Sequence, residues 1–327
     1  MKTKPTLKKI RIIARTHVGM QRSNNEDYHG YSTDIFNNED WHFYEESAIK
    51  TNKNPYIMVV ADGMGGLEMG EEASRIAVET TKQFSFDNAK EISEATQSEL
   101  DSLFKKLFAD INDEILKFAK ENGKTEGELG TTLVIVLVIN NEAQIYWIGD
   151  SRAYMFRKGK LQLLTKDHSY VQELVDSGKL TYEQSFFHPE SNIVTKYMGD
   201  YKNTPVPSHT KQNLEDGDIV LICSDGLNGM LQDKDIEDIF YSSDDLSGIC
   251  QKLIDDANTL GGNDNNTIIL NSFGDFHKHR PKINPNKQLN NGKLQTETRI
   301  VNNFIKKMHK TTTNNKICCK FVQNEIK

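Results

Sequence analysis

Cysteine is scarce in this sequence, with four residues among 327. No C-x-x-C pair has a matching partner, so the sequence has neither a zinc-binding pattern nor the disulfide framework of a small secreted domain. The adjacent Cys318 and Cys319 lie in a polar segment and are interpreted as free thiols. This cysteine usage fits a reducing compartment, and we expect a cytoplasmic protein.

Long hydrophobic runs are also missing. No apolar stretch approaches the ~18–20 residues that a membrane-spanning helix needs, and the mean hydropathy is −0.62. Residues 1–19 carry positive charge without the apolar segment of a signal peptide. A chain of this length can bury a large core in one domain or two, and it needs no disulfide or metal to fold.

Charge is unevenly distributed along the chain, whose net charge is −7. Of the 40 basic and 47 acidic residues, 12 and 3 lie in 275–327, which leaves 28 and 44 in 1–274. We therefore predict a folded domain, 1–274, and a basic, disordered tail, 275–327. An acidic body argues against nucleic acid as a partner of the domain and suits a protein that concentrates cations.

Hydrophobic periodicity predicts strands in consecutive groups, with helices between the groups. Apolar and β-branched runs predict strands at 10–16, 56–63, 131–139, 143–149, 152–157, 192–198, 218–224 and 266–272, with a hairpin turn at Asn140-Asn141. Helical spacing predicts helices at 69–84, 98–120, 168–177 and 244–259, and the polar stretch 32–54 is interpreted as a long surface loop. Because the elements do not alternate strictly, the pattern favours an α+β fold with antiparallel sheets and helices packed outside.

Acidic residues recur at the ends of the apolar strands, most of them beside glycine or asparagine. The six instances are Asn24-Asn25-Glu26-Asp27, Asp62-Gly63-Met64-Gly65-Gly66, Gly149-Asp150-Ser151-Arg152, Asp167-His168, Ser224-Asp225-Gly226 and Gly262-Asn263-Asp264-Asn265-Asn266. One Asp-Gly pair alone is an ordinary turn, and the glycines around Met64 lack the lysine and the spacing of a phosphate-binding loop. Six such instances in one chain indicate a shared site.

Carboxylates that emerge from buried strands are partly desolvated, and several together repel one another. A divalent cation offsets this cost, and ligands that are all oxygen select hard ions such as Mg²⁺ or Mn²⁺. A neighbouring glycine lets the backbone approach the ion or turn sharply. The pattern therefore predicts a metal site built from residues that are far apart in the chain.

These motifs resemble those of the metal-dependent serine/threonine protein phosphatases of the PPM, or type 2C, family in its compact bacterial form. The matching segments include GMQRSNNEDY (19–28), VVADGMGGLEMGEEAS (59–74), GTTLV (130–134), DIVLICSDGL (218–227) and GGNDNNTIIL (261–270), together with 148–181 and 188–199, in the family's order over residues 8–272. The resemblance implies a four-layer α-β-β-α sandwich of two antiparallel sheets flanked by helices. It also places the metal centre at one end of the sandwich, where the strand-end loops converge.

The resemblance further implies which residues bind two Mg²⁺ or Mn²⁺ ions. Asp62 is expected to bridge the ions, and the Gly63 carbonyl is expected on the second. Asp225 and Asp264 are expected to complete the shell of the first ion.

Other residues of the site are assigned by the same resemblance. Glu26 and Asp27 are expected to hold metal-bound waters or to ligate directly. Arg22 is expected to bind the substrate phosphate, because a guanidinium matches two phosphate oxygens and stays charged. Asp167 is expected to form a third, weaker metal site with Asp225.

Four further interpretations concern residues near these motifs. Asp150 is interpreted as a structural residue that closes a hairpin. Met64 stands where some family members have a candidate general-acid histidine, so the leaving-group proton is expected from a metal-bound water. Gly229 stands where some members have an aspartate, which predicts weaker binding of the third ion. Residues 169–205 are expected to form a flap that governs substrate choice.

The sequence thus predicts a protein serine/threonine phosphatase that uses a metal-activated water and forms no phospho-enzyme intermediate, with Arg22, Asp62 and Asp225 as catalytic residues. Its substrates are expected to be phosphoproteins that are targets of a Hanks-type kinase, and the protein is expected to be a monomer. One alternative is a catalytically inactive phosphatase fold that binds or senses, although Asp27, Asp62, Asp225 and Asp264 are all present. Another is a phosphatase of small phosphorylated metabolites.

Overall fold

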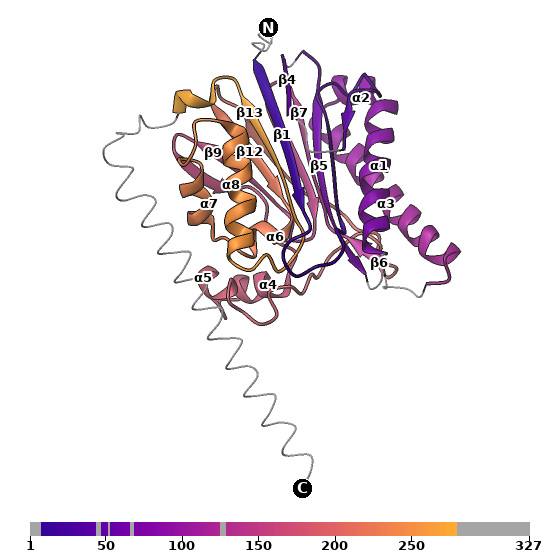
Figure 1. Ribbon diagram of the computed structural model, residues 1–327. Coiled ribbons are helices and arrows are strands. Elements are labelled where there is room, and N and C mark those ends of the chain that lie inside the picture. The colour runs from indigo at the N-terminus through magenta and orange to yellow at the C-terminus, as the bar shows by residue number, and fades with distance from the viewer. Residues whose placement is uncertain (1–7, 44–46, 52, 66–68, 125–128, 280–327) are drawn as a thin grey trace.

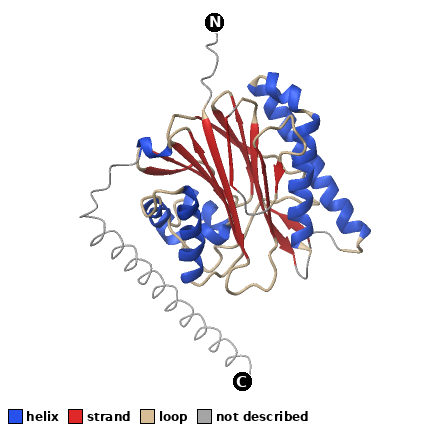
Figure 2. Ribbon diagram, turned by 45° about the horizontal axis from the view of Figure 1, so that its top comes forward, coloured by secondary structure: helices blue, strands red, loops and turns tan. Residues whose placement is uncertain are grey.

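The protein is a sandwich of two antiparallel sheets with helices on both outer faces (Figures 1 and 2). The computed structural model describes residues 8–43, 47–51, 53–65, 69–124 and 129–279. All strand pairs in both sheets are antiparallel. The predicted four-layer α-β-β-α architecture is therefore confirmed.

Each sheet gathers strands from distant parts of the chain. One sheet has the order β10 (Lys160–Leu163), β9 (Arg152–Arg157), β12 (Asp218–Cys223), β13 (Asn266–Phe273), β1 (Lys9–His17) and β4 (Ser47–Thr51). The other has the order β11 (Ser208–Asn213), β8 (Glu142–Ile148), β7 (Leu133–Ile139), β5 (Tyr56–Gly65), β2 (Asp27–Ser32) and β3 (Trp41–His42), and β6 (Leu129–Thr131) pairs with the end of β5.

The helices form the two outer layers. α1 (Gly70–Asp87), α2 (Ala89–Glu94) and α3 (Gln97–Glu121) lie on the sheet that contains β5, whereas α6 (Asp225–Asn228), α7 (Asp233–Ile239) and α8 (Leu246–Thr259) lie on the sheet that contains β12 (Figure 1). The short helices α4 (Tyr170–Asp176) and α5 (Tyr182–Ser185) lie at one end of the sandwich. A 3₁₀ turn, Phe276–His279, follows the last strand.

Three apolar layers hold the sandwich together. The central layer lies between the sheets and includes Ile12, Val60, Val136, Val220 and Ile269, all at most 1% exposed. Separate clusters fill the space under α1 and α3 and the space under α8. Since β7 is buried along its whole length, its sequence is a continuous apolar run without alternation.

Helix α3 shows how the sequence sets one of these elements. Thr96 and Glu99 form a capping box, in which the backbone N–H of Thr96 donates to the Glu99 carboxylate at 2.7 Å. Leu100, Leu107 and Ile111 then recur at helical spacing and pack into the core. The predicted helix at 98–120 is confirmed within two residues at each end.

The sequence was misleading at the surface. Residues 192–198, predicted as a strand, form only the isolated bridges Ser169–Val194 and Thr131–Met198, because this segment runs beside α4 and not within a sheet. The predicted loop 32–54 contains the short strands β3 and β4. In contrast, the predicted turn at Asn140-Asn141 is confirmed, since both residues have positive φ angles of 52° and 62°.

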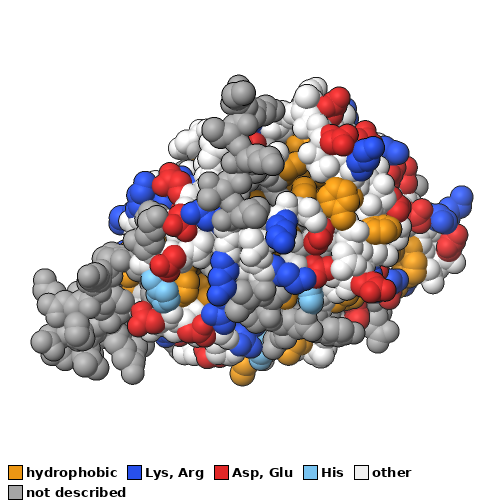
Figure 3. Space-filling model, turned by 90° about the horizontal axis from the view of Figure 1, so that it is seen from above, with side chains coloured by type: hydrophobic (Ala, Val, Ile, Leu, Met, Phe, Trp, Pro, Cys, Tyr) orange, Lys and Arg blue, Asp and Glu red, His pale blue; other side chains and the backbone are white. Residues whose placement is uncertain are grey.

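None of the helices in the described ranges is long and apolar enough to cross a membrane. Residues 280–327 lie outside the described residues, so the predicted tail, including Cys318 and Cys319, stays a prediction. Figure 3 shows the end of the sandwich opposite α4 and α5, where acidic and basic side chains are interspersed over the described surface.

His168 joins the loop after β10 to two strands of the other sheet. Its Nδ1 accepts a hydrogen bond from the backbone N–H of Gly149 at 3.1 Å, and its Nε2 lies 2.9 Å from the hydroxyl of Ser208. Because Nδ1 accepts, the neutral ring carries its proton on Nε2 and donates to Ser208. Burial, followed by the nearby charge of Lys196, lowers the pKa of His168 to about 4.

We expect His168 to stay neutral down to strongly acidic pH and to make the fold acid-sensitive. Its pKa in the folded state lies below the ordinary value, so its stabilising effect is complete above about pH 6.5. That effect is lost as the pH falls through about 4. An NMR titration of the ring protons measures this pKa directly, with His168→Asn to assign the signal. A midpoint near 6.5 would contradict the expectation.

Candidate metal centre

Four of the predicted metal-binding aspartates meet where strands of both sheets end. Asp27 begins β2 and is the cross-strand partner of Asp62 on β5. Asp225 lies two residues after the end of β12 and begins α6, and Asp264 lies two residues before the start of β13. Like charges directly opposite one another are unfavourable in a sheet. The structure thus brings these acids together at the end of the sandwich that α6 marks in Figure 1.

Burial and the neighbouring negative charges raise the pKa values of these carboxyl groups. Desolvation raises the pKa of Asp62 well above its usual range, and the charges of Asp27 and Asp225 raise it further. Desolvation likewise raises the pKa of Asp27 to about 7, although Ser224 donates a hydrogen bond to it at 2.6 Å. The pKa of Asp225 rises to about 6 through desolvation and the charge of Asp264, partly offset by a hydrogen bond with Asp62.

These residues fit a divalent cation. Their donor atoms are all oxygens, and Oδ1 of Asp27 is buried without a hydrogen-bond partner in the described part of the chain. In those same ranges no three Asp, Glu, His or Cys side chains already surround one point closely enough to hold an ion. The carboxylates contact protein groups instead, Asp62 with Asp225 and Asp264 with Arg22. Positive charge would relieve the repulsion among them.

Asn265 holds the loop that carries Arg22 and Glu26 against the start of β13. Its Oδ1 accepts from the backbone N–H of Glu26 at 2.7 Å, and its Nδ2 donates to the carbonyls of Val18 and Asn24 at 2.9 and 2.8 Å. Sequence reasoning missed this role. The signal was present, because an asparagine amide can both donate and accept, and Asn265 lies beside a predicted ligand.

Two glycines are required by close backbone packing at the centre. A Cβ atom on Gly63 would lie 2.2 Å from the carbonyl oxygen of Gly70 and 2.6 Å from that of Glu26. A Cβ atom on Gly226 would lie 1.9 Å from the carbonyl oxygen of Asn265. The glycines beside Asp62 and Asp225 therefore let backbone segments touch, a role that the sequence did not predict.

Arg22 and Glu26 lie at the edge of the aspartate cluster. The side chain of Arg22 is half exposed, and its Nη2 donates to Oδ2 of Asp264 at 2.7 Å. This hydrogen bond raises the pKa of Arg22, so the guanidinium keeps its charge. Desolvation raises the pKa of Glu26, while Arg22 lowers it.

Asp167, predicted as a ligand of a third metal ion, lies beside Arg152, whereas Asp150, interpreted as a structural residue, lies among the buried carboxylates. Both oxygens of Asp167 accept hydrogen bonds from Arg152, at 2.8 and 2.7 Å, so this carboxylate already has a cationic partner. Asp150 is buried, and its pKa is raised by desolvation first and by the charge of Asp225 second. Asp150 was read as a hairpin residue because Asp-Ser is an ordinary turn pair, but it belongs to the carboxylate cluster.

A cleft of about 640 Å³ opens at the cluster. Its lining includes Asp150, Asp167, Asp225 and Asp264, together with the segment around α5 and the loop between α6 and α7. A substrate group that enters the cleft would therefore meet the carboxylates.

The protein has two stacked antiparallel sheets with desolvated carboxylates at one end, beside a cleft. This arrangement is typical of a metal-dependent hydrolase. The family model for protein phosphatase 2C matches residues 31–256. The serine/threonine phosphatase stp of Listeria welshimeri is 34% identical over 257 residues, which cover 78% of this chain and 93% of that protein. The chain belongs to the protein phosphatase 2C family.

Solved structures agree with this assignment. The serine/threonine phosphatase of S. agalactiae matches with a TM-score of 0.67 and 30% identity over 80% of this chain and 99% of that one. The catalytic domain of the phosphatase PstP, solved in complex with two manganese ions, matches with a TM-score of 0.63 and 28% identity over 83% and 100% of the two chains. The predicted class of enzyme, a protein serine/threonine phosphatase that depends on divalent metal, is confirmed.

We expect Asp225→Asn to stabilise the metal-free protein and to remove most of the stabilisation by Mn²⁺. The substitution takes one negative charge from a group of desolvated carboxylates. We expect the melting temperature without metal to rise by about 2–4 °C, equivalent to ~1 kcal/mol for a domain of this size. Thermal melts with EDTA and with Mn²⁺ measure both effects.

The matched control for this comparison is Asp110→Asn, which neutralises an exposed carboxylate on α3. It should leave both melting temperatures close to those of the unaltered protein. A fall in the metal-free melting temperature of Asp225→Asn would show that repulsion is not the dominant interaction in the cluster.

Proposed function

We propose that this enzyme hydrolyses phosphoserine and phosphothreonine in proteins at the carboxylate cluster, with two Mg²⁺ or Mn²⁺ ions. The observation that carries the proposal is the convergence of Asp27, Asp62, Asp225 and Asp264, from four separate segments, beside the cleft that Asp225 and Asp264 line. A cleft of this size has room for a phosphorylated side chain together with neighbouring peptide.

Residues of both sheets would hold the ions. We propose that Asp62 and Asp225, which touch each other, bind the ions directly. Asp27, Asp264 and the Gly63 carbonyl would complete the site. Glu26 would act at its edge, directly or through water. Bound divalent ions lower the pKa of a water molecule toward neutrality and offset charge on the phosphoryl group.

Arg22 is proposed to bind the phosphate. Its guanidinium lies beside Asp264 and is half exposed, so it can turn toward a phosphate in the cleft while the carboxylate turns toward a cation. Two parallel hydrogen bonds to phosphate oxygens would then orient the phosphorus for attack by water. Arg22 would stabilise negative charge that grows on these oxygens during the reaction.

The arrangement supports direct attack by water. Burial raises the pKa of the Cys223 thiol, which leaves it a poor nucleophile. Both ring nitrogens of His168 are engaged with Gly149 and Ser208. Met64, two residues after Asp62, has no proton to donate, so water is the proposed source of the leaving-group proton.

A third, weaker metal site is proposed at Asp150 and Asp225, in place of the pair Asp167 and Asp225. Both oxygens of Asp167 accept hydrogen bonds from Arg152, whereas Asp150 is buried and its pKa is raised by desolvation and by the charge of Asp225. Gly229 offers no side chain to this site, which favours a water-rich shell and weak affinity.

The cellular setting follows from the chemistry of the substrate. A phosphoserine phosphatase requires a kinase to supply its substrate, and we propose targets of a Hanks-type Ser/Thr kinase. The buried cysteines Cys223 and Cys250 are free thiols, in keeping with a reducing compartment such as the cytoplasm. We propose that the enzyme acts as a monomer.

We expect hydrolysis of a phosphothreonine peptide and of p-nitrophenyl phosphate that requires Mn²⁺ or Mg²⁺ and stops in EDTA. The measurement is release of phosphate or nitrophenol at neutral pH. Metal binding without hydrolysis of either substrate would favour an inactive binding module. A strong preference for small phosphorylated metabolites over every phosphopeptide would favour the metabolite phosphatase.

We also expect Arg22→Ala to raise the KM for the phosphopeptide and to lower kcat. Loss of a charged hydrogen bond of about 1.5–3 kcal/mol corresponds to a decrease of roughly ten- to one-hundredfold in kcat/KM. Arg75→Ala is a suitable control, because Arg75 lies on α1 and pairs with Glu72. Equal activities of the two variants would exclude a role of Arg22 in phosphate binding.

A further inference from the structure

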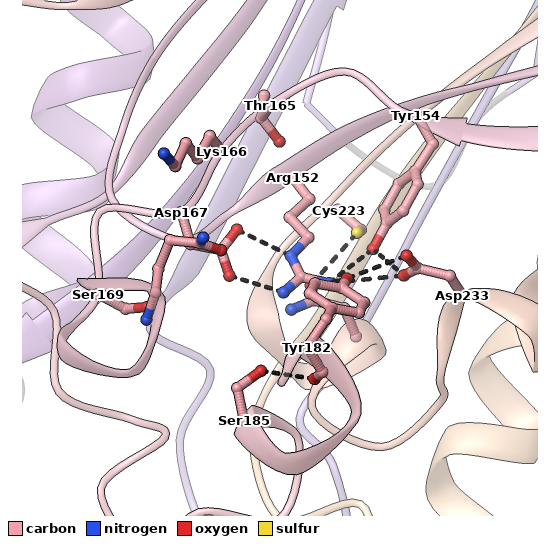
Figure 4. Close-up of polar contacts among 12 residues, drawn as sticks. Arg152, Tyr154, Thr165, Lys166, Asp167, Ser169, Tyr182, Ser185, Cys223 and Asp233 are labelled. Carbon is pink, nitrogen blue, oxygen red and sulfur yellow. Dashed lines mark hydrogen bonds and ion pairs between the residues drawn. The ribbon is translucent and has the colours of Figure 1, made fainter. Parts of the chain in front are cut away.

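A network of polar side chains surrounds Arg152 beside the cleft (Figure 4). Arg152 begins β9, and its side chain is 13% exposed. Its Nε and Nη2 donate to the two oxygens of Asp167, and its Nη1 donates to the hydroxyls of Tyr154 and Tyr182 at 3.1 and 3.0 Å. A buried guanidinium needs this many acceptors to offset its desolvation.

Asp233, the first residue of α7, completes the network from the opposite side. Its Oδ1 accepts from the hydroxyl of Tyr154 at 3.1 Å, and its Oδ2 accepts from the hydroxyl of Tyr182 at 3.0 Å. The Tyr182 hydroxyl therefore accepts from Arg152 and donates to Asp233, which uses both of its hydrogen-bonding functions.

Tyr182 belongs to a different part of the molecule from its partners. It begins α5, whereas Arg152 and Tyr154 lie on β9 and Asp233 lies on α7. The other side-chain hydrogen bonds of α5, those of the Thr181–Gln184 capping box and of Ser185, stay within the helix. They stabilise α5 but do not fix its position. The hydroxyl of Tyr182 ties α5 to the sandwich.

The position of α5 affects the shape of the cleft. Tyr182, Phe186 and Phe187 line the cleft on the side of α5, and Met230 and Asp233 line it on the side of the loop before α7. Because Tyr182 and Asp233 are hydrogen-bonded to each other, this bond sets the separation of the two walls. Asp225 and Asp264 line the same cleft, but Asp264 is held by Arg22 and not by the network around Arg152.

We propose that the Tyr182 hydroxyl is a positioning group that fixes α5 against α7 and so builds the wall that binds the peptide around the phosphorylated residue. The occupant, a segment of a phosphoprotein, rests on the proposed function. A small aryl phosphate reaches the carboxylates without touching this wall, whereas a peptide extends along it. The bond therefore governs recognition of protein substrates and leaves the reaction at phosphorus unchanged.

Tyr182→Phe tests the proposal, because it removes the hydroxyl and keeps the ring over Arg152. We expect the KM for a phosphothreonine peptide to rise roughly three- to tenfold, the factor to which one net hydrogen bond of ~1 kcal/mol corresponds. The kinetic constants for p-nitrophenyl phosphate should stay the same. Amide hydrogen exchange in residues 178–192 should become faster, while exchange in β5 and β12 should not change.

Tyr170→Phe is the matched control. Tyr170 is also a partly exposed tyrosine of the flap, its ring packs against His188, and no described residue is hydrogen-bonded to its hydroxyl. This variant should behave as the unaltered enzyme in every measurement. Equal exchange in Tyr182→Phe and Tyr170→Phe would overturn the proposal, as would equal losses of Tyr182→Phe on the peptide and on p-nitrophenyl phosphate.

Failure of this proposal can be told from failure of the proposed function. Suppose that the unaltered enzyme hydrolyses the substrates with Mn²⁺ and that Tyr182→Phe leaves the KM for the peptide unchanged. These two results together would refute only the role of Tyr182. If the unaltered enzyme hydrolyses neither substrate, the proposed function fails, and the exchange measurement still decides whether the hydroxyl holds α5.

Discussion

Repulsion among desolvated carboxylates is the interaction around which the rest of the structure is organised. Asp27 and Asp62 are opposite one another in adjacent strands, and Asp225 contacts Asp62 from the other sheet. In water such groups would separate, so their positions must be imposed by stronger interactions elsewhere. The apolar layers between the sheets and under the helices provide that constraint, since they fix where every strand ends.

Short-range polar contacts then set the details of the centre. Asn265 joins the Arg22 loop to β13, and Ser224 links Asp27 to the end of β12. Separate contacts organise the cleft, where the hydroxyl of Tyr182 accepts a hydrogen bond from Arg152 and donates one to Asp233. The carboxylate centre and the part of the cleft around α5 are thus held by separate sets of contacts.

Prediction from sequence succeeded where an element is buried and failed where it is exposed. The strands β7 and β12 are apolar along their whole length, and their sequences identify them. The edge strands β10 and β11 have no fully buried residue and were missed, because a strand that pairs along one side alone needs few apolar residues. Residues 192–198 have the apolar spacing of a strand, but their apolar side chains pack near α3 and α4 or face solvent, which local pattern does not reveal.

The sequence by itself determined the family, the sandwich and the set of acids from which the metal centre is drawn, because acids beside glycines at strand ends form a local pattern. Only the tertiary structure decided which partner each acid meets. Asp167 lies against Arg152, Asp150 lies toward Asp225, and Tyr182 reaches Asp233. Electrostatic and hydrogen-bond energies depend on distances in space, and for residues far apart in the chain those distances exist only after the two sheets have packed.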